Sequence, residues 1–111
     1  MGITKTELYT AQQNRIATLA KAIGHPARVA ILQHLLKVQS CVCGEIVDEV
    51  GLSQATISQH LKALKSVGLI SGIIEGTKVC YCINMKAFNE LNNIFSENFT
   101  NNKGIINLEC C

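Results

Sequence analysis

Apolar residues recur at helical intervals in residues 5–23 and again in residues 26–38, which predicts two amphipathic helices near the start of the chain. Pro26 suits the first turn of the second helix, because an N–H at that position would have no partner within the helix. A third, shorter helix is expected at about 43–50. Gly51 is expected to end it, because glycine readily takes the left-handed conformation that commonly follows a helix.

A fourth helix is predicted from Ser53, a favourable capping residue, to about Ser66, and Gly68 is expected to end it. Its larger apolar residues fall on one face when successive residues are placed about 100° apart. Small and polar residues occupy the other face, and no acidic residue occurs between positions 53 and 66. This face is therefore suited to a close approach to a polyanion.

Residues 69–74 and 79–83 have the composition of strands, and a glycine-containing turn separates them, which predicts a β-hairpin. Alternate residues of a strand share one face. Cys80 and Cys82 are therefore expected on the face opposite to the inward-pointing residues. The residues expected to point inward are Val79, Tyr81 and Ile83.

A last helix is predicted at about 85–99, where phenylalanine and aliphatic residues form a wide apolar stripe. The stripe is wide for so small a domain, and we interpret the first and last helices as the seam of a homodimer. The alternative is that these two helices only close the core of their own chain.

The order of these elements predicts a mainly α fold with a small β-hairpin, namely a winged helix-turn-helix with five helices and a two-stranded wing. The 111 residues correspond to one DNA-binding and dimerisation domain at 1–99, followed by a flexible, cysteine-containing tail at 100–111. No apolar stretch approaches the roughly 20 residues that span a bilayer, and the start of the chain lacks an apolar signal region. We therefore expect a cytoplasmic protein without a membrane partner.

Six cysteines form three close pairs, at 41/43, 80/82 and 110/111. In a reducing compartment such cysteines more often bind metals or act in redox chemistry than form structural disulfides. Disulfides within each pair would be strained. The chain contains no Cys-x-x-Cys motif, phosphate-binding loop or Ser/His/Asp grouping, so we do not expect an enzyme.

Several segments together resemble the ArsR/SmtB family of metal-responsive repressors. They are Ala22–Leu32, Ser40–Ile46, Leu52–Leu64 and the wing sequence Glu75–Tyr81. The resemblance covers about residues 10–100. It implies a homodimeric bacterial repressor that binds double-stranded operator DNA without a required cofactor and leaves it when an effector binds.

The resemblance also implies which residues contact DNA. Glutamine and serine side chains in the fourth helix are expected to read base edges, and the remaining contacts are to the groove or to phosphates. For His60 the alternative is a packing role, because it flanks the apolar stripe. The expected DNA-binding residues are Ser53, Gln54, Thr56, Ser58, Gln59, His60, Lys62 and, at the wing tip, Lys78.

The effector is expected to bind sulfur. The zinc-type members of this family bind metal at the last helix through Asp, His and Glu, but residues 85–99 contain no His and no Asp. Cys41-Val42-Cys43 instead resembles the element of arsenic- and antimony-responsive members, and also that of cadmium- and lead-responsive members. We expect trivalent arsenic or antimony first, with cadmium or lead, or a thiol-redox response, as alternatives.

The resemblance leaves the third sulfur ligand open, because position 46, often Cys in the arsenic-responsive form, is Ile here. We expect the metal ligands to be Cys41 and Cys43, completed by Cys110 and Cys111, with Cys80 and Cys82 ranked behind. Positions i and i+2 of an α-helix lie about 200° apart. Chelation by Cys41 and Cys43 is therefore expected to need a frayed or unwound start of the third helix.

Overall fold

The computed structural model describes residues 6–43, 50–76 and 78–100 of the chain. A short 3-10 turn, η1 (Thr6–Leu8), precedes helices α1 (Ala11–Ile23) and α2 (Pro26–Val38). Helix α4 (Gln54–Ser66), strands β1 (Ile70–Glu75) and β2 (Lys78–Ile83) and helix α5 (Met85–Asn98) follow. The winged helix-turn-helix order and the two-stranded antiparallel wing are confirmed.

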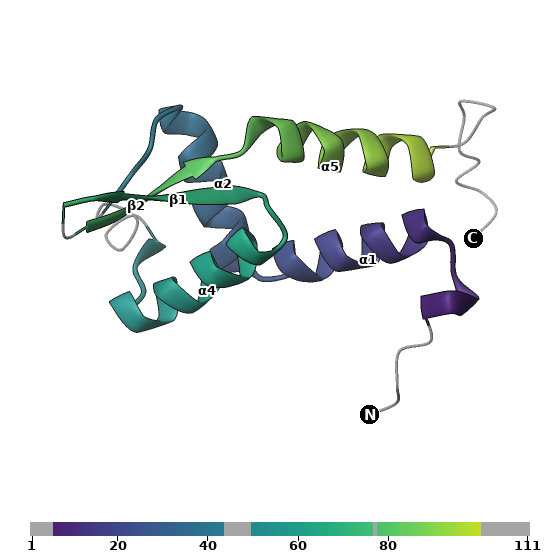
Figure 1. Ribbon diagram of the computed structural model, residues 1–111, viewed down its shortest axis with the longest axis horizontal. Coiled ribbons are helices and arrows are strands. Elements are labelled where there is room, and N and C mark those ends of the chain that lie inside the picture. The colour runs from purple at the N-terminus through teal and green to yellow at the C-terminus, as the bar shows by residue number, and fades with distance from the viewer. Residues whose placement is uncertain (1–5, 44–49, 77, 101–111) are drawn as a thin grey trace, which may run out of the picture.

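The described residues contain four α-helices, where we expected five. The third expected helix, at 43–50, falls almost wholly on residues 44–49, which lie outside the described part of the chain. The tail expected at 100–111 lies outside it too, apart from residue 100. In Figure 1, α1 and α5 run along one end of the molecule, whereas the β1–β2 hairpin and α4 occupy the other end.

Local chemistry sets the ends of the helices as expected. Pro26 occupies the first turn of α2. The Ser53 side chain accepts the backbone N–H of Thr56 at the start of α4. Gly51 and Gly68 have φ angles of +80° and +82°, the left-handed conformation that was expected of both.

The core lies where α1, α2, α4 and α5 meet the base of the hairpin. Tyr81 and Ile83 pack against it, as expected. Val79 does not, because it lies toward the wing tip and is 46% exposed. Cys80, expected on the face opposite to the inward-pointing residues, is buried as well. The most deeply buried side chains are Leu19, Ile31, Leu35, Ile57, Leu64, Leu69, Ile70 and Cys80.

A third extended segment lies along the edge of β2 that β1 leaves open. Val42 and Tyr81 exchange two backbone hydrogen bonds, of 2.9 and 2.8 Å, in an antiparallel bridge. Residues 41–43 are therefore extended and not helical. Chelation by Cys41 and Cys43 was expected to need a frayed or unwound helix start, and the extended segment already has such a non-helical backbone, with positions i and i+2 on one face.

Candidate functional site

Helix α4 presents a polar face to solvent because its apolar residues are held in the core. Ile57, Leu61 and Leu64 are buried, which fixes the rotation of the helix about its axis. The opposite face has no acidic residue and is free to approach a partner. The exposed residues of the expected DNA-binding set on this helix and its cap are Ser53, Gln54, Thr56, Ser58, Gln59 and Lys62.

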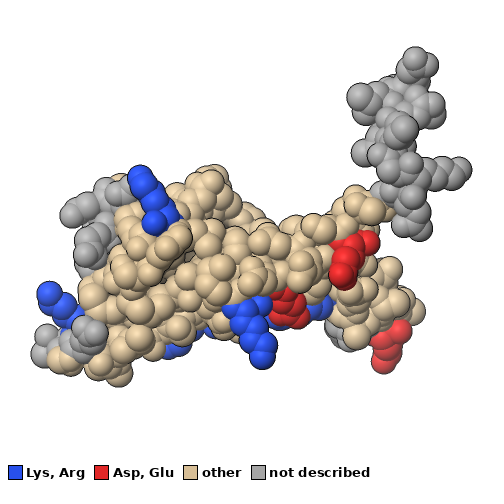
Figure 2. All heavy atoms as spheres, turned by 90° about the horizontal axis from the view of Figure 1, so that it is seen from above, with Lys and Arg blue, Asp and Glu red and all other residues tan. Residues whose placement is uncertain are grey.

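The wing supplies a second exposed basic position. Lys78 follows the turn at Gly76, whose φ of +64° allows the chain to reverse, and its side chain is exposed. Among the described residues on the face seen in Figure 2, the charged side chains on the half that holds the wing are Lys and Arg, and those of Asp and Glu lie on the other half. The described charges of this face therefore favour a polyanion at the α4 and wing end.

His60 is the exception among the expected DNA contacts. Its side chain is 8% exposed, and its Nδ1 accepts a hydrogen bond of 3.0 Å from Nε of Arg28. Its ring also lies against that of His25, with 4.4 Å between ring centroids. These contacts give His60 the packing role considered as the alternative, and they correct its assignment as a groove contact.

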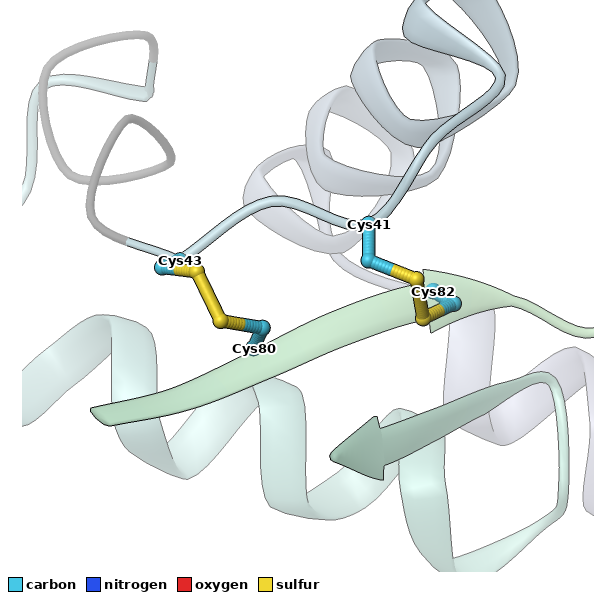
Figure 3. The surroundings of a disulfide bond; sticks show 4 residues. All are labelled: Cys41, Cys43, Cys80 and Cys82. Carbon is cyan, nitrogen blue, oxygen red and sulfur yellow. A yellow bond between two sulfur atoms is a disulfide. The ribbon is translucent and has the colours of Figure 1, made fainter. Parts of the chain in front are cut away.

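Four cysteines meet where the segment after α2 crosses β2. Cys41 is joined to Cys82 and Cys43 to Cys80 by disulfides, with Cα–Cα distances of 4.3 and 4.0 Å. Figure 3 shows the two bonds side by side, bridging the extended segment and the strand. The Val42–Tyr81 bridge lies between them, so its two hydrogen bonds place all four sulfur atoms on one face.

The four cysteine residues differ in their exposure to solvent. Cys80 is buried at 2% exposure, Cys43 and Cys82 are half-buried, and Cys41 is exposed. An apolar hollow of about 450 Å³ borders the Cys41–Cys82 pair. This pair is therefore the part of the cluster that small molecules reach first. The residues lining the hollow are Leu36, Gln39, Ser40, Cys41, Cys82, Ile83 and Met85.

Within the part of the chain that the structure describes, the partners of Cys41 and Cys43 are the cysteines of the wing, and the expected ranking of metal ligands stays a prediction. Cys80 and Cys82, ranked behind the tail, lie against them. Cys110 and Cys111, expected to complete the ligand set, lie outside the described residues. A sequence signal was present: two Cys-x-Cys triplets each put both sulfurs on one face when their segments are extended.

With both disulfides closed, residues 6–43, 50–76 and 78–100 contain no group of three or more His, Cys, Asp or Glu side chains able to hold a metal ion. Within the same ranges, no helix combines the length and apolar character that crossing a bilayer requires. The candidate sites are therefore the α4 and wing surface and the four-cysteine cluster.

Comparison with known proteins agrees with this architecture. The sequence profile described as "Bacterial regulatory protein, arsR family" matches residues 25–71. The HTH-type transcriptional repressor SmtB of Mycobacterium tuberculosis is 41% identical over 63 residues, 57% of this chain and 46% of the relative. The chain thus spans about half the length of that relative.

Two further relatives are matched over most of their own length. The HTH-type transcriptional regulator YgaV of Escherichia coli is 32% identical over 89 residues, 80% of this chain and 90% of the relative. A solution structure from Mycobacterium bovis, described as a homodimeric winged helix-turn-helix DNA-binding domain, has a TM-score of 0.61 and 30% identity. It covers 86% of this chain and 83% of that one. From the matched profile, these relatives and the shared fold, we conclude that the chain belongs to the arsR family of bacterial regulatory proteins.

Proposed function

We propose that the protein is a homodimeric transcriptional repressor that binds operator DNA through α4 and the β1–β2 wing. The observation that carries this proposal is the outward face of α4, which is exposed, polar and without acidic residues. The naming of the M. tuberculosis relative as a repressor and of the M. bovis domain as DNA-binding supports it.

Each part of this surface has a distinct task in the proposed complex. Gln54, Ser58 and Gln59 read base edges, where a bidentate glutamine–adenine pair contributes about 1–3 kcal/mol of discrimination. Lys62 and Lys78 contact phosphates, which fixes register and provides affinity that does not depend on sequence. Thr56 and Ser53 lie at the start of α4, where the backbone N–H groups and the positive end of the helix dipole also favour a phosphate.

The dimer is proposed to form at the α1 and α5 end. Large apolar side chains are exposed there, including Tyr9 at 57% and Phe99 at 71%. A hollow of about 280 Å³ between the two helices is lined in part by Ile16 and Phe99. Burial of these groups against a second copy is favoured because exposed apolar patches of this kind mark interaction surfaces.

The effector is proposed to be trivalent arsenic or antimony, bound by thiolates that include Cys41 and Cys43. Sulfur donors suit soft ions of this class. Cadmium or lead is the alternative ion. A thiol-redox response is a second candidate function, and the pairing of Cys41 with Cys82 and of Cys43 with Cys80 is the observation that favours it.

A gel-shift experiment with duplex DNA from the protein's own promoter tests the proposal at one stated salt concentration, because affinity that depends on phosphate contacts falls steeply with salt. The reduced protein is expected to bind the duplex and to release it on addition of arsenite. Cadmium and hydrogen peroxide are compared in parallel. Binding that ignores arsenite in the wild type, or release that persists undiminished in Cys41→Ser, would contradict the proposed effector.

A further inference from the structure

We propose that Cys41, Cys43, Cys80 and Cys82 in their reduced form make one binding site for a soft, thiophilic metal or metalloid ion. The two disulfides are the oxidised form of the same site, so ion binding and disulfide formation exclude each other. This inference deepens the proposed function by naming its effector site, and it rests on that function only for the consequence for DNA.

The backbone brings the four cysteines together before any ion arrives. Two sides of the cluster are the Cα–Cα distances of 4.3 and 4.0 Å between the strands. The other two sides are the i, i+2 spacings along extended chain, about 6.6 Å each. The four residues therefore form the corners of a small rectangle. Thiolate–metal bonds, about 2.3 Å long for zinc, can close over a rectangle of this size because Cys side chains are flexible.

The hydrogen bonds between Val42 and Tyr81 keep this rectangle in register without help from the disulfides. Both are backbone bonds, and the Val42 side chain between them is buried at 5% exposure. Reduction of the sulfurs therefore leaves the two segments aligned. The ion meets a largely preformed site, which lowers the entropic cost of binding.

The donor set determines the class of ion. Thiolates without carboxylate or imidazole partners select soft ions over magnesium or calcium. A divalent ion such as Cd²⁺ can use all four sulfurs, and trivalent arsenic can use three of them. The hollow beside Cys41 and Cys82 provides the approach to the cluster.

The chemistry of the two states balances. A dithiol reductant transfers two electrons and two protons to each disulfide, giving two Cys thiols and the reductant's own disulfide. Coordination of Cd²⁺ by the four thiols then releases their four protons. In the opposite direction, one hydrogen peroxide takes two electrons and two protons from each pair of thiols and leaves as two water molecules, because its O–O bond breaks as the S–S bond forms.

The position of the site explains how it reaches DNA. Cys80 lies two residues from Lys78 on β2, and Cys43 directly precedes the segment that leads toward α4. Occupancy of the site therefore couples the wing to the chain that enters the DNA-reading helix. The tail cysteines are not needed for this coupling.

Binding of Cd²⁺ and of arsenite to the reduced protein, in the absence of DNA, tests the site. Competition with a chromophoric chelator gives the Cd²⁺ affinity, and ultraviolet thiolate-to-metal absorption gives the stoichiometry. We expect one Cd²⁺ per chain in the wild type and in the matched control Cys110→Ser/Cys111→Ser, which also loses two thiols. The double variant Cys80→Ser/Cys82→Ser is expected to bind both probes at least about 100-fold more weakly, because half of the ligands are gone.

Two further measurements complete the test. Because Cys80 is buried, Cys82→Ser alone is included as a variant that keeps the core intact, and it is expected to bind Cd²⁺ at least about tenfold more weakly. The oxidised protein is expected to bind neither probe until a dithiol is added. The proposal is overturned if the wing variants keep wild-type affinity, if only the tail variant loses it, or if the oxidised protein binds Cd²⁺ as tightly as the reduced protein. Failure to bind operator DNA would leave these results unchanged, so the two proposals fail separately.

Discussion

Two of the polar contacts in this domain show how a single residue holds separate elements together. At the first, Arg28 donates from Nε to His60 and from its terminal nitrogen to the backbone oxygen of Ala22, at 3.0 and 3.1 Å. One side chain at the start of α2 thereby links α2 to the end of α1 and to the buried side of α4. Burial lowers the pKa of His60 below its ordinary value of 6.5, and the charges of His25 and Arg28 lower the pKa further.

This contact makes stability depend on pH. Because folding lowers the pKa of His60, the unfolded chain takes up a proton first as the pH falls below about 6.5, and the free energy of unfolding decreases with it. His60→Asn keeps an acceptor for Arg28 but cannot titrate. Urea unfolding at about pH 7.5 and about pH 5 is expected to show a smaller loss in the variant than in the wild type. An equal loss in both proteins would rule His60 out as its source.

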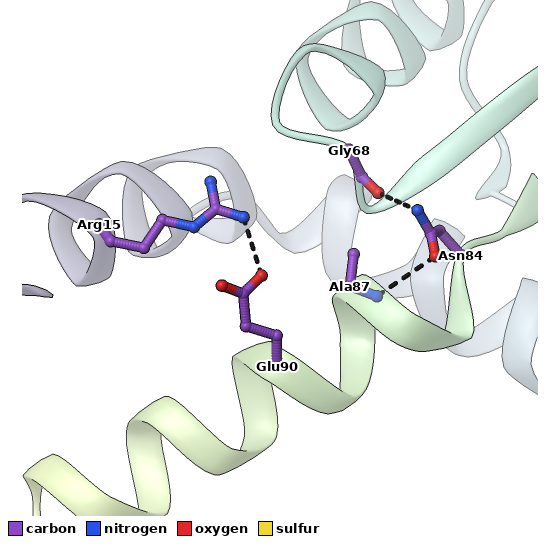
Figure 4. A network of polar contacts seen from close by, with 5 residues as sticks. All are labelled: Arg15, Gly68, Asn84, Ala87 and Glu90. Carbon is purple, nitrogen blue, oxygen red and sulfur yellow. Dashed lines mark hydrogen bonds and ion pairs between the residues drawn. The ribbon is translucent and has the colours of Figure 1, made fainter.

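The second contact involves Asn84, the cap of α5 (Figure 4). Its side-chain nitrogen Nδ2 donates to the backbone oxygen of Gly68, and its side-chain oxygen Oδ1 accepts a hydrogen bond from the backbone N–H of Ala87. Asn84→Ala is expected to lower the free energy of unfolding by about 1–2 kcal/mol, measured by urea unfolding. Arg15→Ala removes the exposed ion pair with Glu90 drawn in the same figure and serves as the comparison. It is expected to cost less than about 0.5 kcal/mol, and the reverse order of the two losses would contradict this account.

At the scale of elements, α4 and the wing divide the proposed work of binding DNA. The helix carries side chains that can distinguish bases, whereas Lys78 of the wing is proposed to contact the phosphate backbone of the DNA. The two elements are physically connected, because α4 packs against β1. We therefore expect a shift of the hairpin to move the helix as well.

Two substitutions separate these contributions. Gln59→Ala is expected to weaken operator binding by about 1–3 kcal/mol and to relax the preference at one base pair. Lys78→Ala is expected to weaken binding to all sequences alike and to reduce the slope of log K against log salt by about 1. Gel shifts over a salt series on operator and scrambled duplexes measure both effects. Lys37→Ala, at the end of α2, is the control. If Lys37→Ala reduced the salt slope as much as Lys78→Ala does, the effect could not be assigned to a phosphate contact of the wing.

At the scale of the whole molecule, exposed apolar side chains occur at both ends. On the wing they are Ile73, Ile74 and Val79, beside the basic groups seen in Figure 2. At the α1 and α5 end they are Leu8, Tyr9 and Phe99. A second copy at the α1 and α5 end would leave both α4 helices free to reach one duplex. This arrangement suits the symmetric half-sites that dimeric helix-turn-helix proteins bind.

Sedimentation velocity tests the proposed dimer with two matched variants. Phe99→Asp, at the α5 end and 71% exposed, is expected to shift the protein from dimer to monomer at micromolar concentration, because it places a charge in the apolar seam. Ile74→Asp, on the wing and 78% exposed, is expected to leave the dimer intact. If Ile74→Asp dissociated the dimer, or if Phe99→Asp remained a dimer, the dimer interface would have to lie elsewhere.

The features that the sequence predicted well are local ones. The cap at Ser53 and the stops at Gly51 and Gly68 follow from backbone rules that act within a few residues. The bridge between Val42 and Tyr81 was missed because it joins segments about 40 residues apart. Neither segment contains a local pattern that shows with which other segment it pairs. The packing role of His60 depends on Arg28, which lies on α2 and not on α4. The sequence of α4 alone could therefore not show whether His60 faces solvent or the core.

The link between Cys43 and Cys80, 37 residues apart, closes a loop of chain that contains all of α4, β1 and the hairpin turn. Helices α1, α2 and α5 lie outside that loop. In the oxidised protein, one cut by a protease anywhere inside the loop would therefore leave the two fragments covalently attached. A cross-link of this span also lowers the conformational entropy of the unfolded chain, which raises the free energy of unfolding by about 4 kcal/mol. Oxidation is thus expected to protect the segment that holds α4 and the wing from separation by proteolysis.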